Sequence, residues 1–246
     1  MQAALERVAQ RMRSAERVTV ITGAGVSAAS GVPTFRGPEG MWRSFRPEAL
    51  ATPQAFQRDP KLVWEWYAWR RELIAGCKPN AAHDVLARWS RRPGFTLITQ
   101  NVDGLHERAG SHDVIRFHGS IWELRCASGC GQHTWEDRSV PLDPLPPRCP
   151  LCGGFARPGV VWFGEAIDPL ALRRCEEALT CDLFLSVGTS SLVYPAAGLL
   201  HTARSRGAFT VEINPQATTA AVDLAIGAPA ETALALIDRS VGRLEG

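Results

Sequence analysis

Short runs of apolar residues alternate with amphipathic stretches along most of the chain. The apolar runs, several of them rich in β-branched residues, predict buried strands over 17–22, 95–99, 114–117, 182–187, 209–213 and 223–226. Apolar positions at helical spacing predict helices over 1–15, 61–76, 80–90, 169–179, 195–205 and 231–241. Strands that alternate with helices in this way predict an α/β fold with a doubly wound parallel sheet.

A glycine or a polar residue directly follows each predicted strand before residue 220, at Gly23, Gln100, His118, Gly188 and Asn214. Ligands of parallel sheets bind outside the C-terminal ends of the strands, so these positions are candidates for a binding site. Gly23, Gly25 and Ala28 also fit G-x-G-x-x-G/A, the dinucleotide fingerprint. A plain glycine turn between a strand and a helix would look the same, so this motif alone leaves both interpretations open.

Two segments depart from the alternation. Residues 37–51 are rich in Gly, Pro and Arg and predict a loop of the kind that closes over a bound ligand. Thr52-Pro53 and Asp59-Pro60 are helix-start signals before the helix predicted over 61–76, which is dense in aromatic residues. Residues 121–157 hold four cysteines, many prolines and few aliphatic residues, so we expect this part to bury little core.

The four cysteines of that segment have the spacing of a zinc site. Cys126-x3-Cys130 and Cys149-x2-Cys152 are separated by 18 residues, and four thiolates would complete a tetrahedral, structural site with no open position. The first pair is one residue wider than the commonest ribbon. The alternatives are a redox pair or disulfides, and His133 as a substitute ligand. A zinc ion would replace the missing core of this segment.

Composition narrows the class of protein. The chain has 246 residues and a formal net charge of +2, which gives no reason to expect a nucleic-acid partner. No apolar run reaches the ~18 residues of a membrane span, and the basic N-terminal stretch lacks the apolar core of a secretory signal. Glu6 and Glu16 argue against a transit peptide. Seven unevenly placed cysteines favour a reducing compartment, and we expect the cytoplasm.

A set of motifs in a fixed order carries a resemblance to one family. They are Gly23-Ala-Gly-Val-Ser27, Ser30-Gly-Val-Pro-Thr-Phe-Arg36, Thr99-Gln-Asn-Val-Asp-Gly-Leu-His106, Phe117-His118-Gly119, the two cysteine pairs, Pro158-Gly-Val-Val-Trp-Phe-Gly-Glu165, Gly188-Thr-Ser190 and Ile213-Asn214. Over nearly the whole chain this order resembles the sirtuins, NAD-dependent protein-lysine deacylases. The resemblance implies a Rossmann-type NAD-binding domain formed by 1–36, 80–119 and 158–246. A helical insertion, 37–79, and a zinc module, 120–157, would form a small second domain.

The resemblance also implies roles for individual residues. NAD would be bound by Gly23, Ala24, Gly25, Ser27, Phe35, Arg36, Gln100, Asn101, Val102, Asp103, Gly188, Thr189, Ser190, Asn214 and Ala228. Within this set, Asn101 and Asp103 resemble the pair that forms the nicotinamide pocket. Val161 and Phe163 would line the acyl-lysine tunnel, and Gly164 and Glu165 would offer backbone to the peptide as an added strand.

His118 resembles the general base of the family, a role that suits an imidazole whose reference pKa is ~6.5. By the family's mechanism NAD is consumed as a co-substrate. The products are free lysine, nicotinamide and O-acyl-ADP-ribose. Acyl-lysine proteins would be the partners, and we expect a monomer without nucleic-acid or membrane partners.

Tyr67 and Arg70 bear on which acyl group is removed. Residues three apart share one helix face, and Tyr67-x-x-Arg70 resembles the signature of the sirtuin branch that removes malonyl, succinyl or glutaryl groups. Arg70 would bind the acyl carboxylate and Tyr67 would add a hydroxyl. The alternative is an aromatic core helix with a surface arginine, an interpretation that suits the neighbouring Arg71.

Three other activities share parts of these patterns. An NAD dehydrogenase would share the glycine loop, but it needs an acidic residue ~20 positions further on, where this chain has Met41-Trp-Arg43. A zinc-ribbon nucleic-acid module is the non-enzymatic alternative, and the low net charge and the few lysines weigh against it. A plain deacetylase or a mono-ADP-ribosyltransferase of the same fold is the nearest alternative.

Overall fold

The computed structural model describes residues 1–33, 46–190, 195–216, 218 and 220–242. Its main sheet has the order β3-β2-β1-β7-β8-β9, and every neighbouring pair is parallel. The strands are β1 (Val18–Thr22), β2 (Phe95–Thr99), β3 (Ile115–Arg116), β7 (Leu183–Val187), β8 (Phe209–Ile213) and β9 (Leu224–Ile226). Numbered within this sheet, the order is that of a Rossmann-type dinucleotide-binding fold, so the predicted fold class is confirmed.

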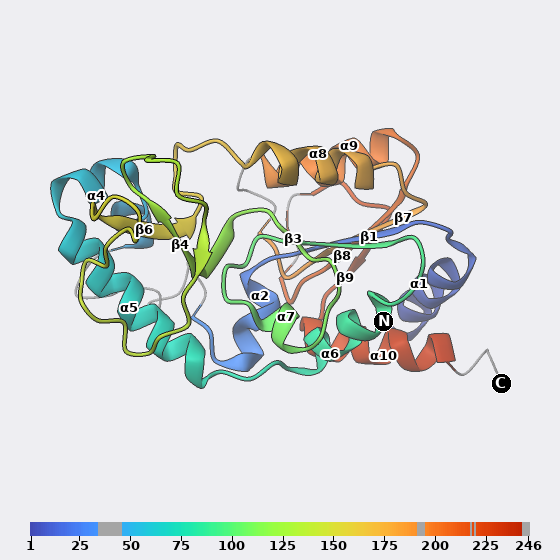
Figure 1. Ribbon diagram of the computed structural model, residues 1–246. Coiled ribbons are helices and arrows are strands. Elements are labelled where there is room, and N and C mark those ends of the chain that lie inside the picture. The colour runs from blue at the N-terminus through green and yellow to red at the C-terminus, as the bar shows by residue number, and fades with distance from the viewer. Residues whose placement is uncertain (34–45, 191–194, 217, 219, 243–246) are drawn as a thin grey trace.

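Helices cover both faces of this sheet (Figure 1). α1 (Gln2–Ser14), α6 (Ala81–Trp89) and α10 (Ala230–Gly242) lie on one face, and α8 (Pro169–Ala178) and α9 (Ala196–Ser205) on the other. The side chains of β1 alternate between the two layers: Val18 and Val20 belong to the first core cluster and Ile21 to the second. This two-sided burial explains why the strands read as continuous apolar runs.

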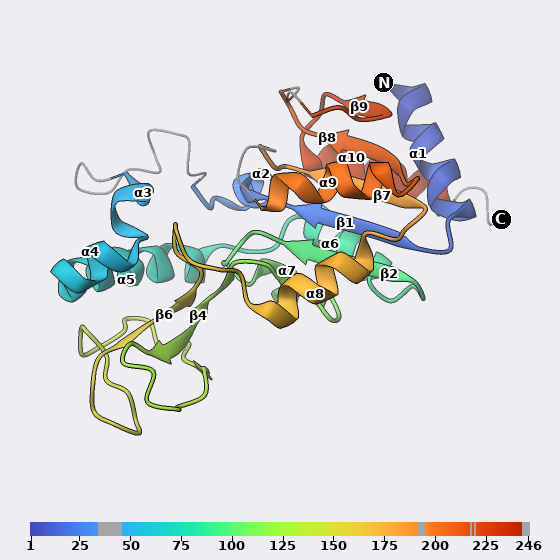
Figure 2. The ribbon, with the colours of Figure 1, turned by 90° about the horizontal axis from the view of Figure 1, so that it is seen from above.

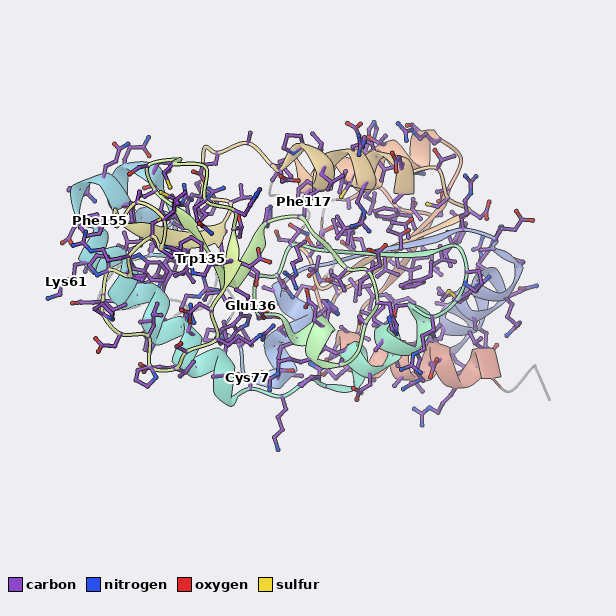
Figure 3. All side chains as sticks on the ribbon, viewed as in Figure 1. Lys61, Cys77, Phe117, Trp135, Glu136 and Phe155 are labelled. Carbon is purple, nitrogen blue, oxygen red and sulfur yellow. The ribbon has the colours of Figure 1, made fainter. Side chains whose placement is uncertain are left out.

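A smaller part lies beside the parallel sheet (Figure 2). It contains α3 (Pro47–Leu50), α4 (Pro53–Arg58), α5 (Pro60–Gly76) and an antiparallel sheet of order β5-β4-β6, formed by β5 (Trp135–Glu136), β4 (Gly119–Cys126) and β6 (Ala156–Val160). A third core cluster joins α4 and α5 to this sheet. Figure 3 labels Trp135 and Phe155 in this part and Phe117 near its junction with the parallel sheet.

Two expectations for this part are wrong. Residues 37–51 are not all loop, because α3 lies at Pro47–Leu50, whereas residues 34–45 lie outside the described ranges. Nor is 121–157 without a core: Trp122, Leu124 and Leu142 are 1–6% exposed and belong to the cluster with α5. The few large side chains of this segment gather on one side, a distribution that composition alone does not reveal.

The predicted helix starts are confirmed by side-chain caps. Thr52 Oγ1 accepts from the Ala55 N–H at 3.1 Å, and Asp59 Oδ1 accepts from the Leu62 N–H at 2.9 Å. The glycine turn is followed by α2 (Ala24–Ser27) and a 3₁₀ turn, η1 (Ala28–Ser30), as predicted. The short helix α7 (Leu105–Arg108) was not predicted.

The predicted division into two domains stays a prediction, but the strand pairing bears on it. β4 begins directly after His118 and pairs with β6, with Gly119 opposite Val160. The antiparallel sheet therefore crosses the predicted boundaries at 119/120 and 157/158. Within the described ranges, no helix is both long and apolar enough to cross a membrane.

Candidate active site

The loops after β1 and β7 meet where the strand order of the parallel sheet reverses. The Gly25 N–H donates to Gly188 O at 2.8 Å, and the Gly23 N–H donates to Val187 O at 3.0 Å. A Cβ on Gly23 would lie 2.8 Å from Gly188 O, so no larger residue fits. The glycines of the fingerprint thus permit two loops to touch, and their own N–H groups bond within the chain. That the loop holds a pyrophosphate stays a prediction.

Asn101 and Asp103 turn their side chains towards this glycine loop. Asn101 Nδ2 donates to Gly23 O at 3.0 Å and to Ser27 Oγ at 3.2 Å. Ser27 Oγ in turn donates to Asp103 Oδ2 at 2.7 Å, and the Leu105 N–H donates to Asp103 Oδ1 at 2.8 Å. Burial raises the pKa of the Asp103 carboxyl, although both hydrogen bonds oppose the shift. The three predicted residues form one polar cluster, in which Ser27 and Asp103 are buried and Asn101 is half-buried.

His118 follows β3 and is held by the neighbouring strand end. Its Nδ1 lies 3.1 Å from Gln100 O. A carbonyl oxygen only accepts, so Nδ1 carries the proton of the neutral ring and Nε2 keeps its lone pair. Burial lowers the pKa of the imidazole. The ring can therefore take up a proton at Nε2 at neutral pH, as a general base must.

Several other residues predicted to bind NAD gather at the ends of β7, β8 and β9. Asn214 Nδ2 donates to Thr189 O at 2.9 Å, and Gln100 Nε2 donates to Thr189 Oγ1 at 2.9 Å. Ala228 follows β9 and is buried, and Ser190 is half-buried. The strand ends thus bring together predicted residues from distant parts of the chain. Phe35 and Arg36, also predicted to bind NAD, lie outside the described residues.

His83 and His106 form a buried pair behind the glycine loop, with ring centroids 4.9 Å apart. His83 Nδ1 accepts from the Asn80 N–H at 3.2 Å, and His106 Nε2 lies 2.9 Å from Thr22 Oγ1. Burial lowers the pKa of His83 to about 3 and that of His106 to about 4. Both are therefore neutral in the folded protein at neutral pH.

This pair predicts that acid destabilises the protein. Below pH 6.5 the unfolded chain binds protons on both histidines, whereas the folded chain binds them only near pH 3–4. As the pH is lowered below 6.5, the free energy of unfolding should therefore decrease by up to about 1.4 kcal/mol per pH unit for each histidine. Urea unfolding at several pH values would measure the slope. His83→Gln should make it shallower and the exposed His112→Gln should not; equal slopes would contradict the prediction.

Tyr67 and Arg70 lie on α5, on the side of the site where the acyl group is predicted. Trp162 Nε1 donates to Tyr67 Oη at 2.9 Å. Tyr67 is 2% exposed, and burial raises its pKa to about 12, so the phenol keeps its proton. The guanidinium of Arg70 lies 5.1 Å from the centre of the Trp66 ring and is near enough to Tyr67 for each to affect the pKa of the other.

The segment predicted to receive the substrate follows β6. The Val161 N–H donates to His118 O at 3.0 Å, which places the end of β6 beside the predicted base. Phe163 is 47% exposed, and its N–H donates to Ala51 O at 3.0 Å. Glu165 Oε1 is 2.5 Å from Arg157 Nη1, and the Arg157 guanidinium lies 3.4 Å from the centre of the Trp162 ring. Gly164 has φ +84°, which turns the chain there.

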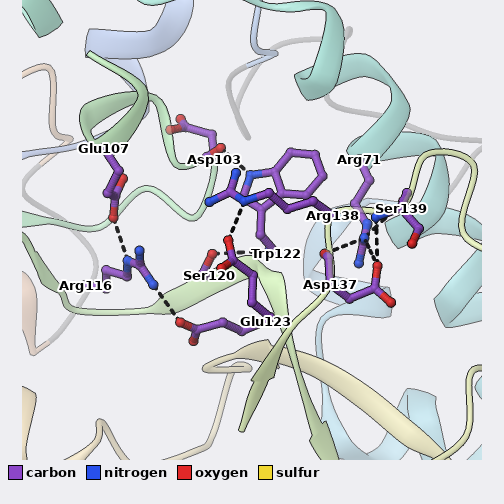
Figure 4. A network of polar contacts seen from close by, with 11 residues as sticks. Arg71, Asp103, Glu107, Arg116, Ser120, Trp122, Glu123, Asp137, Arg138 and Ser139 are labelled. Atoms are coloured by element: carbon purple, nitrogen blue, oxygen red, sulfur yellow. Dashed lines mark hydrogen bonds and ion pairs between the residues drawn. The ribbon is translucent and has the colours of Figure 1, made fainter. Parts of the chain in front are cut away.

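The interpretation of Arg71 as a surface arginine is wrong. Its side chain is 1% exposed, and its Nη2 donates to Asp137 Oδ1 at 2.8 Å (Figure 4). The helical periodicity predicts the buried aromatic face of α5. It does not reveal that the loop 137–139 covers the adjoining face, which carries Arg71. A local pattern does not report which distant segment covers a helix.

The four predicted zinc ligands lie together. The sulfurs of Cys126 and Cys152 are 3.7 Å apart, those of Cys130 and Cys149 are 3.6 Å apart, and all four lie within 4.8 Å of one another. A tetrahedron with Zn–S bonds of about 2.3 Å has edges of about 3.8 Å, so the two closest sulfur pairs match a zinc site and the four-cysteine cluster is consistent with one. His133 is not part of this cluster.

The comparisons with known proteins agree with this geometry. The model of the Sir2 family matches residues 23–195, and the chain belongs to that family. An NAD-dependent protein deacylase of Aquifex aeolicus (strain VF5) is 53% identical over 203 residues, which cover 82% of this chain and 84% of that protein. The resemblance to sirtuins is thereby confirmed.

Solved structures show the same fold. A structure described as a Sir2 homolog–NAD complex has a TM-score of 0.92 and 42% identity, and the match covers 98% of this chain and 95% of that one. Another, described as Sir2Af2 bound to a myristoylated histone peptide, has a TM-score of 0.79 and 31% identity, with 100% and 99% covered.

Sequence reasoning missed two tryptophans that contact predicted site residues. Trp162 lies within one of the family motifs, which predicted no role for it, and its indole N–H donates to Tyr67 Oη. Trp122 belongs to none of the predicted sites, yet its indole N–H donates to Asp103 O at 2.7 Å. No pattern in the sequence reports where an indole N–H finds its acceptor.

Proposed function

We propose that this member of the Sir2 family is an NAD-dependent protein-lysine deacylase that removes succinyl or malonyl groups and also acetyl groups. The NAD-dependent deacylase activity is supported by the family, by the relative named for that activity and by the NAD complex of a similar structure. The acidic-acyl preference rests on one observation, the hydrogen bond from Trp162 to Tyr67.

That hydrogen bond decides what Tyr67 can offer a ligand. The phenol oxygen accepts the indole N–H of Trp162 at 2.9 Å. The phenol O–H, which keeps its proton because burial raises the Tyr67 pKa to about 12, is then directed away from the indole as a donor. A donor beside the cationic Arg70 suits an acyl chain that ends in a carboxylate. An acetyl group would not use either contact.

The remaining residues have roles that suit the same reaction. NAD supplies an activated ribose whose bond to nicotinamide is broken. His118 would take a proton at Nε2, and Asp103 with Asn101 would hold the nicotinamide carboxamide. Val161 and Phe163 would line the tunnel for the acyl-lysine, and the backbone at Gly164 and Glu165 would pair with the peptide. The products would be free lysine, nicotinamide and O-acyl-ADP-ribose.

Arg70→Met is the test of the acyl preference. A hydrogen bond to a charged group contributes about 1.5–3 kcal/mol, so kcat/KM for a succinyl-lysine peptide should fall roughly ten- to over a hundred-fold. For the matched acetyl-lysine peptide it should change far less. Single-turnover assays with NAD and matched acetyl-, malonyl-, succinyl- and glutaryl-lysine peptides would measure both. Lys61→Met, exposed in the first turn of the same helix, is the control.

The same assays separate the alternatives. Equal losses on both peptides would remove Arg70 from the acyl pocket, and activity on acetyl-lysine alone would indicate a plain deacetylase. Labelled NAD distinguishes transfer to protein from formation of small O-acyl-ADP-ribose, and label on the protein would indicate a mono-ADP-ribosyltransferase. That the enzyme is a monomer in the cytoplasm without nucleic-acid partners stays a prediction.

A further inference from the structure

The turn that carries Asn101 and Asp103 is held from behind by β4. The Ile121 N–H donates to Val102 O at 2.9 Å, and Trp122 Nε1 donates to Asp103 O at 2.7 Å (Figure 4). Two successive carbonyls of the turn therefore accept from β4. The side chains of Asn101 and Asp103 point the other way and bond to Gly23 and Ser27. The turn is fixed between the glycine loop and the indole of Trp122.

The indole lies directly against the next residue of the turn. Gly104 has φ +76°, and a Cβ there would lie 3.0 Å from Trp122 Cδ1 and 3.1 Å from its Nε1. Any side chain at this position would press on the indole and would also be strained by its backbone conformation. The close contact and the hydrogen bond thus depend on the same pair, Gly104 and Trp122.

Two arginines hold the indole in place. Arg71 on α5 lies 5.2 Å from the centre of the Trp122 ring, and Arg138 lies 5.7 Å from it. The loop 137–139 is held by hydrogen bonds as well, because Arg71 Nη2 donates to Asp137 O at 2.6 Å and to Ser139 O at 3.1 Å. The Asp137 N–H donates to Trp122 O at 2.8 Å. Both the ring and the backbone of Trp122 are therefore constrained.

We infer that Trp122 is a positioning residue for the nicotinamide side of the NAD site. This inference rests on the proposed function, because it takes Asn101 and Asp103 as the residues that hold nicotinamide. Without the indole N–H, the Ile121 N–H is the remaining bond from β4 to the carbonyls of residues 102 and 103. The turn then gains freedom, and Asp103 is presented to the carboxamide less accurately. Arg71, one position beyond Arg70, acts through Trp122 and does not touch the ligand.

The test compares Trp122→Phe with Trp89→Phe. Each substitution keeps an aromatic ring and deletes one indole N–H donor, since Trp89 Nε1 donates to Asp238 Oδ1 at 2.8 Å. The Trp89 ring packs on Phe95 at the start of β2, the end of that strand away from the turn. The two tryptophans are similarly buried, at 4% and 6% exposed. Hydrogen exchange of a peptide that spans residues 100–105 should become faster in Trp122→Phe and stay unchanged in Trp89→Phe. This measurement does not depend on enzyme activity.

The kinetic readout is inhibition by nicotinamide. In Trp122→Phe the inhibition constant for nicotinamide should rise by about five-fold, the effect of one neutral hydrogen bond, while the KM for the acyl-lysine peptide stays within about two-fold. Trp89→Phe should change neither. If the wild-type protein showed no NAD-dependent deacylation, the proposed function would be wrong. The hydrogen-exchange experiment would still decide whether Trp122 holds the turn.

Gly104→Ala provides a second variant that leaves the indole itself intact. Its Cβ would displace the indole from the turn, so faster exchange over 100–105 and weaker nicotinamide inhibition are expected again. The inference is overturned if exchange over 100–105 is unchanged in both Trp122→Phe and Gly104→Ala. It is also overturned if Trp122→Phe loses peptide and nicotinamide binding together, because that result describes a general loss of structure.

Discussion

Removal of zinc is expected to abolish activity by unfolding the small part of the molecule. The four thiolates lie at the end of β4, in the loop before β5 and in the turn before β6, with sulfur separations of 3.6 and 3.7 Å in the two closest pairs. Without a metal, no bond holds the four sulfurs together. The ends of β4 and β6 would separate, and the cluster that holds Leu124 and Ala156 against α5 would open.

Metal content, thermal melting and deacylation can be measured together after treatment with a chelator and in Cys149→Ser. We expect about one zinc ion per chain in the untreated protein. After removal we expect loss of zinc, loss of activity and loss of the contribution of the small part to the melting curve. Cys77→Ser is the matched control, because Cys77 lies outside the cluster and its Sγ–H donates to Leu73 O at 3.4 Å, a bond that serine can keep. A fully folded, active protein without zinc would refute the prediction.

His118→Ala is expected to lower kcat/KM by about 10²–10⁴-fold, the usual contribution of a general base. The pH profile provides the sharper test. Burial holds the pKa of His118 below its ordinary value of 6.5, so the ring stays unprotonated at neutral pH and becomes protonated only in more acid solution. Activity should therefore be constant near pH 7 and fall with a midpoint below 6.5.

The alanine variant should lose most of its activity, and the activity that remains should no longer fall in acid solution with this midpoint. His112→Ala, which removes an exposed histidine a few residues earlier in the chain, should keep both the activity and its fall in acid. If the His118 variant kept the fall of activity in acid, another group would cause that fall. The buried carboxyl of Asp103 would be the first candidate, because burial raises its pKa. Such a result would remove His118 from the role of base.

Local signals predicted most of the fold because they are contained in continuous segments. The strands of the parallel sheet are short apolar runs, and β1 and β7 at its centre are buried along their whole length, so their composition is enough to recognise them. The caps at Thr52 and Asp59 act within three residues and are equally local. Two strands of the antiparallel sheet were missed because β5 has two residues and β6 contains a proline and a glycine.

The glycines of the loop after β1 are explained in part by a local motif and in part by a tertiary contact. The fingerprint predicted a loop that admits a ligand, and the spacing of Gly23 and Gly25 was sufficient for that. The structure gives a further reason for the same glycines, because a Cβ on either would collide with the backbone of Gly188, which lies in a loop more than 160 positions later. Such a collision is invisible in a local motif.

The sequence by itself determined the strands of the parallel sheet and the longer helices, the four zinc ligands and the family to which the chain belongs. These properties depend on periodicity, on ligand spacing and on motifs of a few residues. The tertiary structure alone decided that Arg71 is buried, that Trp162 orients Tyr67 across 95 positions of sequence, and that Trp122 supports Asp103. Each is a contact between distant segments, and the chain forms it only when the two layers and the small sheet are in place.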